Sequence, residues 1–245
     1  MSTAIETEGL SKTFKGKTAV DHLNLSIKKN ELFGLLGVNG AGKTTTIKML
    51  CRLMHPDSGK IKVHGEELSD TEAKQIINFS PQETAVAPNL TVKENLELMA
   101  GMYGLNKTAA AENTIKAIKE LHLNEVENSR AKVLSGGWQR RLSIAMAMVT
   151  DPEILFLDEP TLGLDVIARH ELWHTISELK TKRTIILTTH YLEEAENLCD
   201  RIAVMAEGRI KAMGTAEELK KKAGCDDFEK AFIALAGAEA GRTEI

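Results

Sequence analysis

The segment GVNGAGKT, residues 37–44, constrains the fold more than any other part of the chain. It has the pattern Gly-x-x-x-x-Gly-Lys-Thr, follows the apolar run LFGLL (32–36) and leads into KTTTIKMLCRLM (43–54). Such a loop binds phosphate only where a buried strand turns into a helix, because the loop N–H groups and the helix N-terminus must face one ligand. The sequence therefore predicts a buried strand, a phosphate-binding loop and a helix, in that order.

The positions of this loop have separate tasks in the expected site. Glycines let the backbone turn its N–H groups toward phosphate oxygens, Lys43 reaches the outer phosphates, and the Thr44 hydroxyl binds Mg²⁺. The plain alternative is a glycine turn with an exposed lysine, which would need neither the strand nor the helix. We therefore expect the chain to bind a nucleoside triphosphate. The residues expected around the phosphates are Gly37, Asn39, Gly40, Ala41, Gly42, Lys43, Thr44 and Thr45.

Strand-like and helix-like segments alternate along most of the chain. HLNLSI (22–27) alternates apolar and polar residues, which predicts a strand with one exposed face. Strand–helix alternation predicts an α/β fold with a mainly parallel sheet. Further strands are predicted at KIKVHG (60–65), INFSP (77–81), ILFLDE (154–159), TIILTTH (184–190) and RIAVMAEG (201–208), with helices at about 165–180 and from Leu192.

The region between about residues 83 and 150 has a helical pattern, and we interpret it as an insert in the α/β core. Residues 1–224 are expected to form one domain that includes this insert. A short helical tail should follow over 225–245, with Phe228, Phe232 and Leu235 at helical spacing before a polar, frayed end. The first helix of the insert is predicted from a Thr91–Glu94 capping box to about Tyr103. A second is predicted over about 108–122, with Ile115, Ile118 and Leu121 on one face, and a third begins after Gly137.

Composition bears on the partners and the compartment. The net charge of −4 offers no clustered basic excess of the kind that nucleic-acid binders carry, so we expect no nucleic-acid partner. Cys51, Cys199 and Cys225 are scattered and odd in number, which indicates buried or partly buried thiols of a reducing compartment. The polar start MSTAIETEGLSKTF and the lack of an apolar run near 18–20 residues predict a cytoplasmic chain without a membrane span of its own.

Two adjacent carboxylates end the apolar run ILFLDEP, residues 154–160. In open α/β sheets, ligands bind beyond the carboxyl ends of the strands, so Asp158 and Glu159 should face the same edge as the phosphate loop. There Asp158 would hold Mg²⁺, and Glu159 would orient or deprotonate an attacking water. The plain alternative is a pair of solvated acids at a strand end.

Three further residues are weaker candidates by themselves. His190 ends TIILTTH, another strand expected at the same edge, although a lone histidine is usually structural. Gln82 follows a strand, which is ordinary for glutamine. Phe14 has a ring that stacks on a base face in some sites, although a single aromatic residue usually belongs to a core.

The segment LSGGW, residues 134–138, contains Ser135, Gly136 and Gly137 directly before a predicted helix. Free N–H groups at such a start bind anions, so the chain holds a second phosphate-ready helix start. A second such site is redundant in a monomer, but it is useful in a head-to-tail dimer. The alternative is a capped helix start without a ligand.

The order of these pieces resembles the ATP-binding cassette (ABC) ATPase domain over about residues 4–222. The resemblance implies a P-loop NTPase core, an N-terminal antiparallel β subdomain and an inserted helical subdomain. It also implies hydrolysis of ATP with Mg²⁺ by two copies, in which Ser135, Gly136 and Gly137 of one copy close over ATP held by the other. The resemblance implies that Phe14 stacks on adenine and that His190 senses the γ-phosphate. It implies that Gln82 contacts Mg²⁺ and the attacking water and couples the site to a membrane partner. Asp165 would lie in the loop that bridges the two subunits.

Trp138 stands where glutamine is commonest in the family. A residue other than glutamine at this position resembles the export-type members. The resemblance implies a separate membrane-spanning permease that docks on the helical insert near Gln82 and holds the chain at the cytoplasmic face. A soluble ABC-type ATPase of DNA repair or the ribosome is the main alternative, but the chain has no sustained heptads and only one cassette. A P-loop kinase or GTPase would leave LSGGW unexplained, and no N-K-x-D motif is present.

Overall fold

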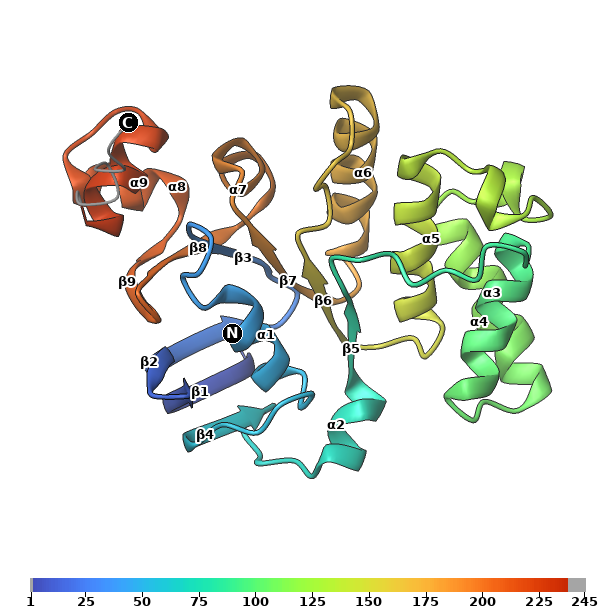
Figure 1. The fold of residues 1–245 in the computed structure, drawn as a ribbon, viewed down its shortest axis with the longest axis horizontal. Coiled ribbons are helices and arrows are strands. Elements are labelled where there is room, and N and C mark those ends of the chain that lie inside the picture. The colour runs from blue at the N-terminus through green and yellow to red at the C-terminus, as the bar shows by residue number, and fades with distance from the viewer. Residues whose placement is uncertain (1, 238–245) are drawn as a thin grey trace.

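A six-stranded sheet forms the centre of the protein (Figure 1). The computed structural model describes residues 2–237. The strand order is β5-β6-β7-β3-β8-β9, and every pairing is parallel except that of β8 with β9. The strands are β3 (Leu32–Leu36), β5 (Ile77–Ser80), β6 (Ile154–Asp158), β7 (Thr184–Thr189), β8 (Arg201–Ala206) and β9 (Arg209–Gly214). The expected α/β fold with a mainly parallel sheet is confirmed.

The strands next to the phosphate loop are buried on both faces. All residues of β3, β6 and β7 are buried, which explains their apolar composition. Phe33, Phe156 and Ile186 pack into one hydrophobic cluster, whereas Leu157 and Leu187 pack into another on the opposite face. The central sheet therefore separates two cores.

A second sheet of three antiparallel strands covers the first cluster. It consists of β2 (Lys17–Lys28), β1 (Thr3–Phe14) and β4 (Ser58–Val63), and it confirms the antiparallel N-terminal sheet. The alternation in β2 is as predicted, because Leu23, Leu25 and Ile27 are buried. The alternation of buried and exposed residues in β1 is less regular. Its register with β2 shifts repeatedly, and Gly9 has a φ of +59°.

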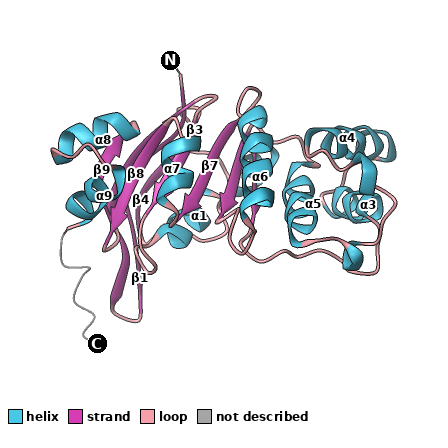
Figure 2. Cartoon of the chain, turned by 90° about the horizontal axis from the view of Figure 1, so that it is seen from above, coloured by secondary structure: helices cyan, strands magenta, loops and turns pink. Residues whose placement is uncertain are grey.

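Helices cover both faces and both ends of the central sheet (Figure 2). Helix α1 packs between the two sheets, and α6 packs on the opposite face of the central sheet. The helices of the core are α1 (Lys43–Leu50), α2 (Asp70–Ile76), α6 (Val166–Leu179), α7 (Leu192–Leu198), α8 (Ala216–Ala223) and α9 (Phe228–Ala236). Within residues 2–237, no helix combines the length and apolar character needed to cross a membrane.

The predicted end of α1 is wrong. The helix stops at Leu50 and not at Met54, because Arg52 adopts a left-handed φ of 58°. The N–H groups of Leu53 and Met54 then both bond to the carbonyl of Lys48, which closes the helix end. The tail forms α9 as its spacing predicts, and the polar end expected to be frayed lies in residues 238–245, outside the described part.

The segment between β5 and β6 is helical, as expected, and extends to one end of the molecule (Figures 1 and 2). Thr91 and Glu94 form the predicted capping box. Helix α5 begins at Gly136, two residues earlier than predicted, and is buried from Arg140 to Met148. The elements of this segment are α3 (Val92–Met102), α4 (Lys107–Glu120), the 3₁₀ turns η1 (Asn124–Val126) and η2 (Ala131–Val133), and α5 (Gly136–Met148).

One residue of the predicted face of α4 is exposed. Ile118 and Leu121 are buried, but Ile115 is 66% exposed. The buried stripe passes through Thr114, Ala117 and Ile118. Ile115 lies about 100° from Thr114 around the helix axis, which takes it beyond the edge of that stripe.

A buried carboxylate joins three elements behind the sheet edge. Glu194 of α7 is fully buried, and its Oε1 accepts hydrogen bonds from Thr161 Oγ1 (2.9 Å) and Trp173 Nε1 (3.0 Å). Burial raises the pKa of Glu194 above its ordinary value. The charged form is therefore less favourable in the folded protein than in the unfolded chain.

We expect Glu194→Gln to fold stably, because an amide oxygen still accepts from Thr161 and Trp173. Glu194→Leu should lose about 1–3 kcal/mol of stability, because both donors lose their acceptor. Since the folded pKa is raised, the wild type gives up stability as pH rises through that pKa, whereas Glu194→Gln does not. Denaturant unfolding at pH 5 and pH 8 measures the free energy of unfolding of both proteins. If Glu194→Gln loses more stability than the wild type between pH 5 and pH 8, the assignment is contradicted.

Candidate active site

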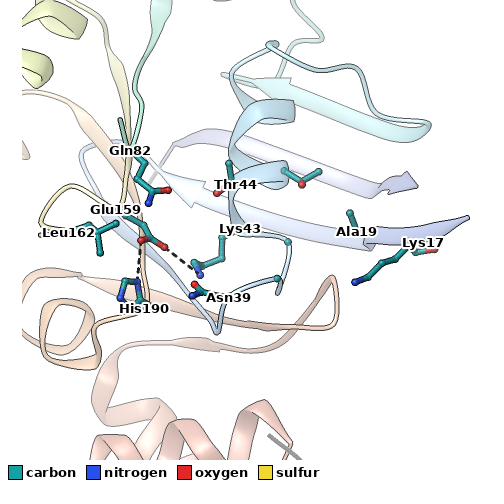
Figure 3. A pocket seen from close by; sticks show the side chains of 13 residues that line it. Lys17, Ala19, Asn39, Lys43, Thr44, Gln82, Glu159, Leu162 and His190 are labelled. Carbon is teal, nitrogen blue, oxygen red and sulfur yellow. Dashed lines mark ion pairs between the residues drawn. The ribbon is translucent and has the colours of Figure 1, made fainter. Parts of the chain in front are cut away.

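A pocket of about 650 Å³ opens at the carboxyl edge of the central sheet (Figure 3). The parallel register brings its walls together, since Leu36 of β3 pairs with Thr189 and Asp158 of β6 pairs with Thr188. The residues that follow these strands therefore emerge side by side. The lining consists of Lys17, Thr18, Ala19, Asn39, Gly40, Gly42, Lys43, Thr44, Thr45, Gln82, Glu159, Leu162 and His190.

The phosphate loop forms the floor of this pocket between β3 and α1. Gly42 has a φ of +104°, and a Cβ atom there would lie 2.4 Å from the carbonyl oxygen of Ala19. Only glycine satisfies both conditions. Gly37 and Ala41 belong to the same loop but do not line the pocket.

The ammonium group of Lys43 is held inside its own loop. Its Nζ donates to the carbonyl oxygens of Gly37 (2.7 Å) and Val38 (3.3 Å), and the residue is only 5% exposed. Burial lowers the pKa of Lys43, while the nearby carboxylates of Glu159 and Asp158 act in the opposite direction. A buried cation with neutral acceptors favours a ligand that brings negative charge.

Asp158 lies behind the pocket wall and is 3% exposed. Its Oδ1 accepts from Thr188 Oγ1 (2.5 Å) and from Thr44 Oγ1 (3.4 Å). A carboxylate and a hydroxyl at this spacing supply oxygen ligands of the kind that Mg²⁺ prefers. Residues 2–237 contain no group of three or more His, Cys, Asp and Glu side chains that could hold a metal ion. The side chains of Thr44 and Asp158 are the oxygen donors at this place that could take part in holding Mg²⁺.

Glu159 stands between two basic side chains (Figure 3). Its Oε1 lies 3.9 Å from Lys43 Nζ, and its Oε2 lies 3.2 Å from His190 Nδ1, although the latter contact lacks hydrogen-bond alignment. Glu159 has a left-handed φ of +46°, and its N–H donates to the side chain and carbonyl of Thr188. A non-glycine residue held in this region costs about 1–3 kcal/mol, and such costs are concentrated at functional sites.

Several predicted residues do lie together here. Lys43, Thr44, Gln82, Glu159 and His190 all line the pocket, together with the loop residues Asn39, Gly40, Gly42 and Thr45. Gln82 follows β5, the strand next to β6. The side chains expected for phosphate, water and metal contacts are therefore assembled from four separate stretches of chain.

Phe14 does not line the pocket. It ends β1, is 42% exposed, and carries Lys12 Nζ 5.7 Å above its ring. Across the hairpin it pairs with Lys17, the first of three successive lining residues, 17–19. Sequence reasoning missed these three residues and Leu162, because they belong to no sequence motif and reach the pocket only through the fold of the chain.

Ser135, Gly136, Gly137 and Asp165 also lie outside the pocket of their own chain. Ser135 caps α5, and Asp165 caps α6 by accepting from the N–H of Ala168 at 2.9 Å. The two helix starts touch, because a Cβ on Gly137 would lie 3.1 Å from the Cβ of Ala168. A single chain therefore leaves the second phosphate-ready helix start away from its own phosphate loop.

Known proteins show the same organisation. The sequence pattern of the family described as ABC transporter matches residues 20–162. The "Probable multidrug ABC transporter ATP-binding protein YbhF" of Escherichia coli (strain K12) is 39% identical over 95% of this chain, but the chain spans only 42% of that relative. The "Nod factor export ATP-binding protein I" of Burkholderia orbicola is 42% identical over 92% of this chain and 75% of its own length.

A solved structure supports the fold as well as the family. It is the dimeric, post-hydrolysis state of the ATP-binding cassette MJ0796 bound to ADP and Pi, with a TM-score of 0.75 and 25% identity. The similarity covers 86% of this chain and 98% of that one. The family pattern, the exporter relative and the shared fold agree with the pocket geometry, and the chain belongs to the ABC transporter family as an ATP-binding domain.

Proposed function

We propose that the chain binds ATP in this pocket and hydrolyses it to energise an exporter. The observation that carries the proposal is the position of the Glu159 carboxylate, which faces the P-loop lysine on one side and His190 on the other. The exporter relative is consistent with this function. The pocket is also lined by Lys43, whose buried ammonium group favours a ligand with negative charge.

The loop residues bind the triphosphate in this proposal. Backbone N–H groups from Gly37 to Thr45 face the phosphates, and Lys43 exchanges its two carbonyl acceptors for phosphate oxygens. Charge-assisted hydrogen bonds are stronger than the neutral ones they replace. The adenine would lie toward Lys17–Ala19, with the Phe14 ring beside it at the hairpin.

Thr44, Asp158 and Gln82 would hold Mg²⁺ together with the phosphates. When bound there, the ion neutralises charge on the β- and γ-phosphates. Thr44 Oγ1 and Asp158 Oδ1 are already 3.4 Å apart, which supports this assignment.

Glu159 acts as the general base. Its carboxylate accepts a proton from water while the water oxygen forms a bond to the γ-phosphorus. The bond from the γ-phosphorus to the β–γ bridging oxygen breaks, and ADP and inorganic phosphate leave. His190 lies 3.2 Å from Oε2, where it keeps the carboxylate oriented and contacts the γ-phosphate. Gln82 positions the attacking water.

The site is completed by a second copy. Ser135 is the N-cap of α5, which begins at Gly136, and Ser135, Gly136 and Gly137 do not line the pocket of their own chain. In a head-to-tail dimer they would face the ATP of the partner, with Asp165 in the loop that bridges the copies. The dimeric form of the related cassette MJ0796 supports this arrangement. ATP would then join the two copies, and its hydrolysis would release them.

A separate membrane permease is the second partner. It would dock on the helical segment between β5 and β6 near Gln82, which holds the domain at the cytoplasmic face. The export-type relatives and Trp138 support outward transport. We include no nucleic acid among the partners, in line with the net charge of −4.

Glu159→Gln should leave ATP binding intact and lower kcat by at least about 10²-fold, because the amide cannot accept the proton from water. It should also trap an ATP-bound dimer, detectable by size-exclusion chromatography with ATP. Glu153→Gln is the matched control, because Glu153 is an exposed residue directly before the first residue of β6, at the end of the strand away from Glu159. A Glu159→Gln protein that stays monomeric at every ATP concentration would contradict the shared site.

Lys43→Ala should weaken nucleotide binding itself, by about 10- to 100-fold in Kd, because a charge-assisted contact contributes about 1.5–3 kcal/mol. Titration with a fluorescent ATP analogue measures the change. Lys48→Ala alters another lysine of α1 that does not line the pocket, and it should bind as the wild type does. Equal affinities of the two variants would argue against Lys43 as a phosphate ligand.

The permease is tested by affinity purification of the chain from its native membranes in mild detergent. We expect an integral membrane protein to co-purify in a constant ratio. Recovery of ribosomes or DNA in its place would favour the soluble alternative.

A further inference from the structure

Arg140 of α5 has an unusual set of partners. The residue is 3% exposed, and its guanidinium donates only to main-chain carbonyl oxygens. Among residues 2–237, no carboxylate lies within ion-pair distance of it. The four bonds run from Nε to Pro160 (2.8 Å), from Nη2 to Asp158 (2.8 Å), and from Nη1 to Pro81 (2.5 Å) and Gln82 (3.2 Å).

These carbonyls belong to two segments that leave the sheet next to each other. Pro81 and Gln82 follow β5, the residues Asp158–Pro160 end and follow β6, and the two strands are paired in parallel. The first segment carries the Gln82 side chain into the pocket, and the second carries that of Glu159. One side chain therefore fixes the backbone at both positions.

Arginine suits this task better than any other residue. Its planar group holds several donors in a rigid fork, which can fix the relative position of four acceptors. Burial lowers the pKa of Arg140 to about 10, so the group remains protonated near neutral pH. The carbonyls thus receive charge-assisted bonds throughout the ordinary pH range.

Arg140 also stands close to the outward-facing start of its helix. Gly137 lies three residues earlier on α5, less than one helical turn away. A helix is rigid over that length, so a displacement of its start is carried to the guanidinium and to the two bonded segments.

We propose that Arg140 is a positioning residue that ties the start of α5 to Gln82 and Glu159 of the same chain. Contact of Ser135–Gly137 with nucleotide held by a second copy would then adjust the hydrolytic side chains of this chain's own pocket. The inference rests on the proposed ATPase dimer and deepens it, because it links the two shared sites through one buried side chain.

The neighbouring Arg141 provides a matched control. Its Nη2 lies 3.0 Å from Glu171 Oε2, and its guanidinium lies 5.2 Å from the ring centre of Trp138. It makes no hydrogen bond to the Gln82 or Asp158 segments. Replacing it alters the same helix without touching the two segments.

The experiment compares Arg140→Gln, Arg140→Lys and Arg141→Gln in the full chain. We expect Arg140→Gln to lower kcat for ATP hydrolysis by about 10²-fold, since a shift of about 1 Å in a catalytic group has that effect. KM should stay within about threefold, because the phosphate loop is unchanged. Arg140→Lys should recover part of kcat through the carbonyls that its ammonium reaches, and Arg141→Gln should resemble the wild type.

Dimer formation separates positioning from general structural support. In the Glu159→Gln background, Arg140→Gln should still form the ATP-dependent dimer, because Ser135–Gly137 and the phosphate loop are intact. Loss of the dimer together with kcat would overturn the proposal and make Arg140 a purely structural residue. If Arg140→Gln does not fold by thermal melting, Arg140→Lys decides by the same two measurements.

The outcomes also separate this inference from the function beneath it. A folded wild-type chain that neither binds nor hydrolyses ATP would contradict the proposed function. An active wild type, with Arg140→Gln within threefold of Arg141→Gln in kcat, would overturn only the role of Arg140.

Discussion

The parallel pairing of β3, β6 and β7 positions the side chains of the pocket that follow these strands. Their ladders bring Leu36 opposite Thr189 and Asp158 opposite Thr188, so the three strands end at one level. A slip of one residue would turn each following side chain to the opposite face. The hydrophobic clusters on the two faces of the sheet prevent such a slip, and the pocket is a direct consequence of their packing.

The charged side chains of the pocket lie next to one another. Lys43 is bonded to carbonyls of its own loop and faces Glu159, which also faces His190. An arriving triphosphate competes for the lysine and brings negative charge close to the glutamate. Binding and reaction are thereby connected through the same few side chains, because a ligand that takes Lys43 also changes the surroundings of Glu159.

Helix α5 connects the outside of the domain with its interior. It begins at LSGGW on the surface, where Ser135 is its cap, and it continues as a buried helix from Arg140. The guanidinium of Arg140 reaches the carbonyls of Gln82 and Asp158 beneath the pocket. The same helix would thus contact the nucleotide of a second copy at its start and the backbone beneath this chain's own pocket at Arg140.

The fold class and most of the pocket could be predicted from the sequence, because glycine spacing and apolar strands leave few alternatives around residues 37–44. It also marked Glu159 and His190, since each ends an apolar strand. Lys17–Ala19 were not predicted, because they belong to no sequence motif and the fold of the β1–β2 hairpin brings them to the pocket. Ile115 was predicted on the buried face of α4, but the packing of that helix leaves it exposed. Two features could not be predicted: LSGGW lies away from its own phosphate loop, and Arg140, one of two adjacent arginines, lies beneath the pocket. Both depend on how α5 packs against the sheet, which no local pattern in the sequence encodes.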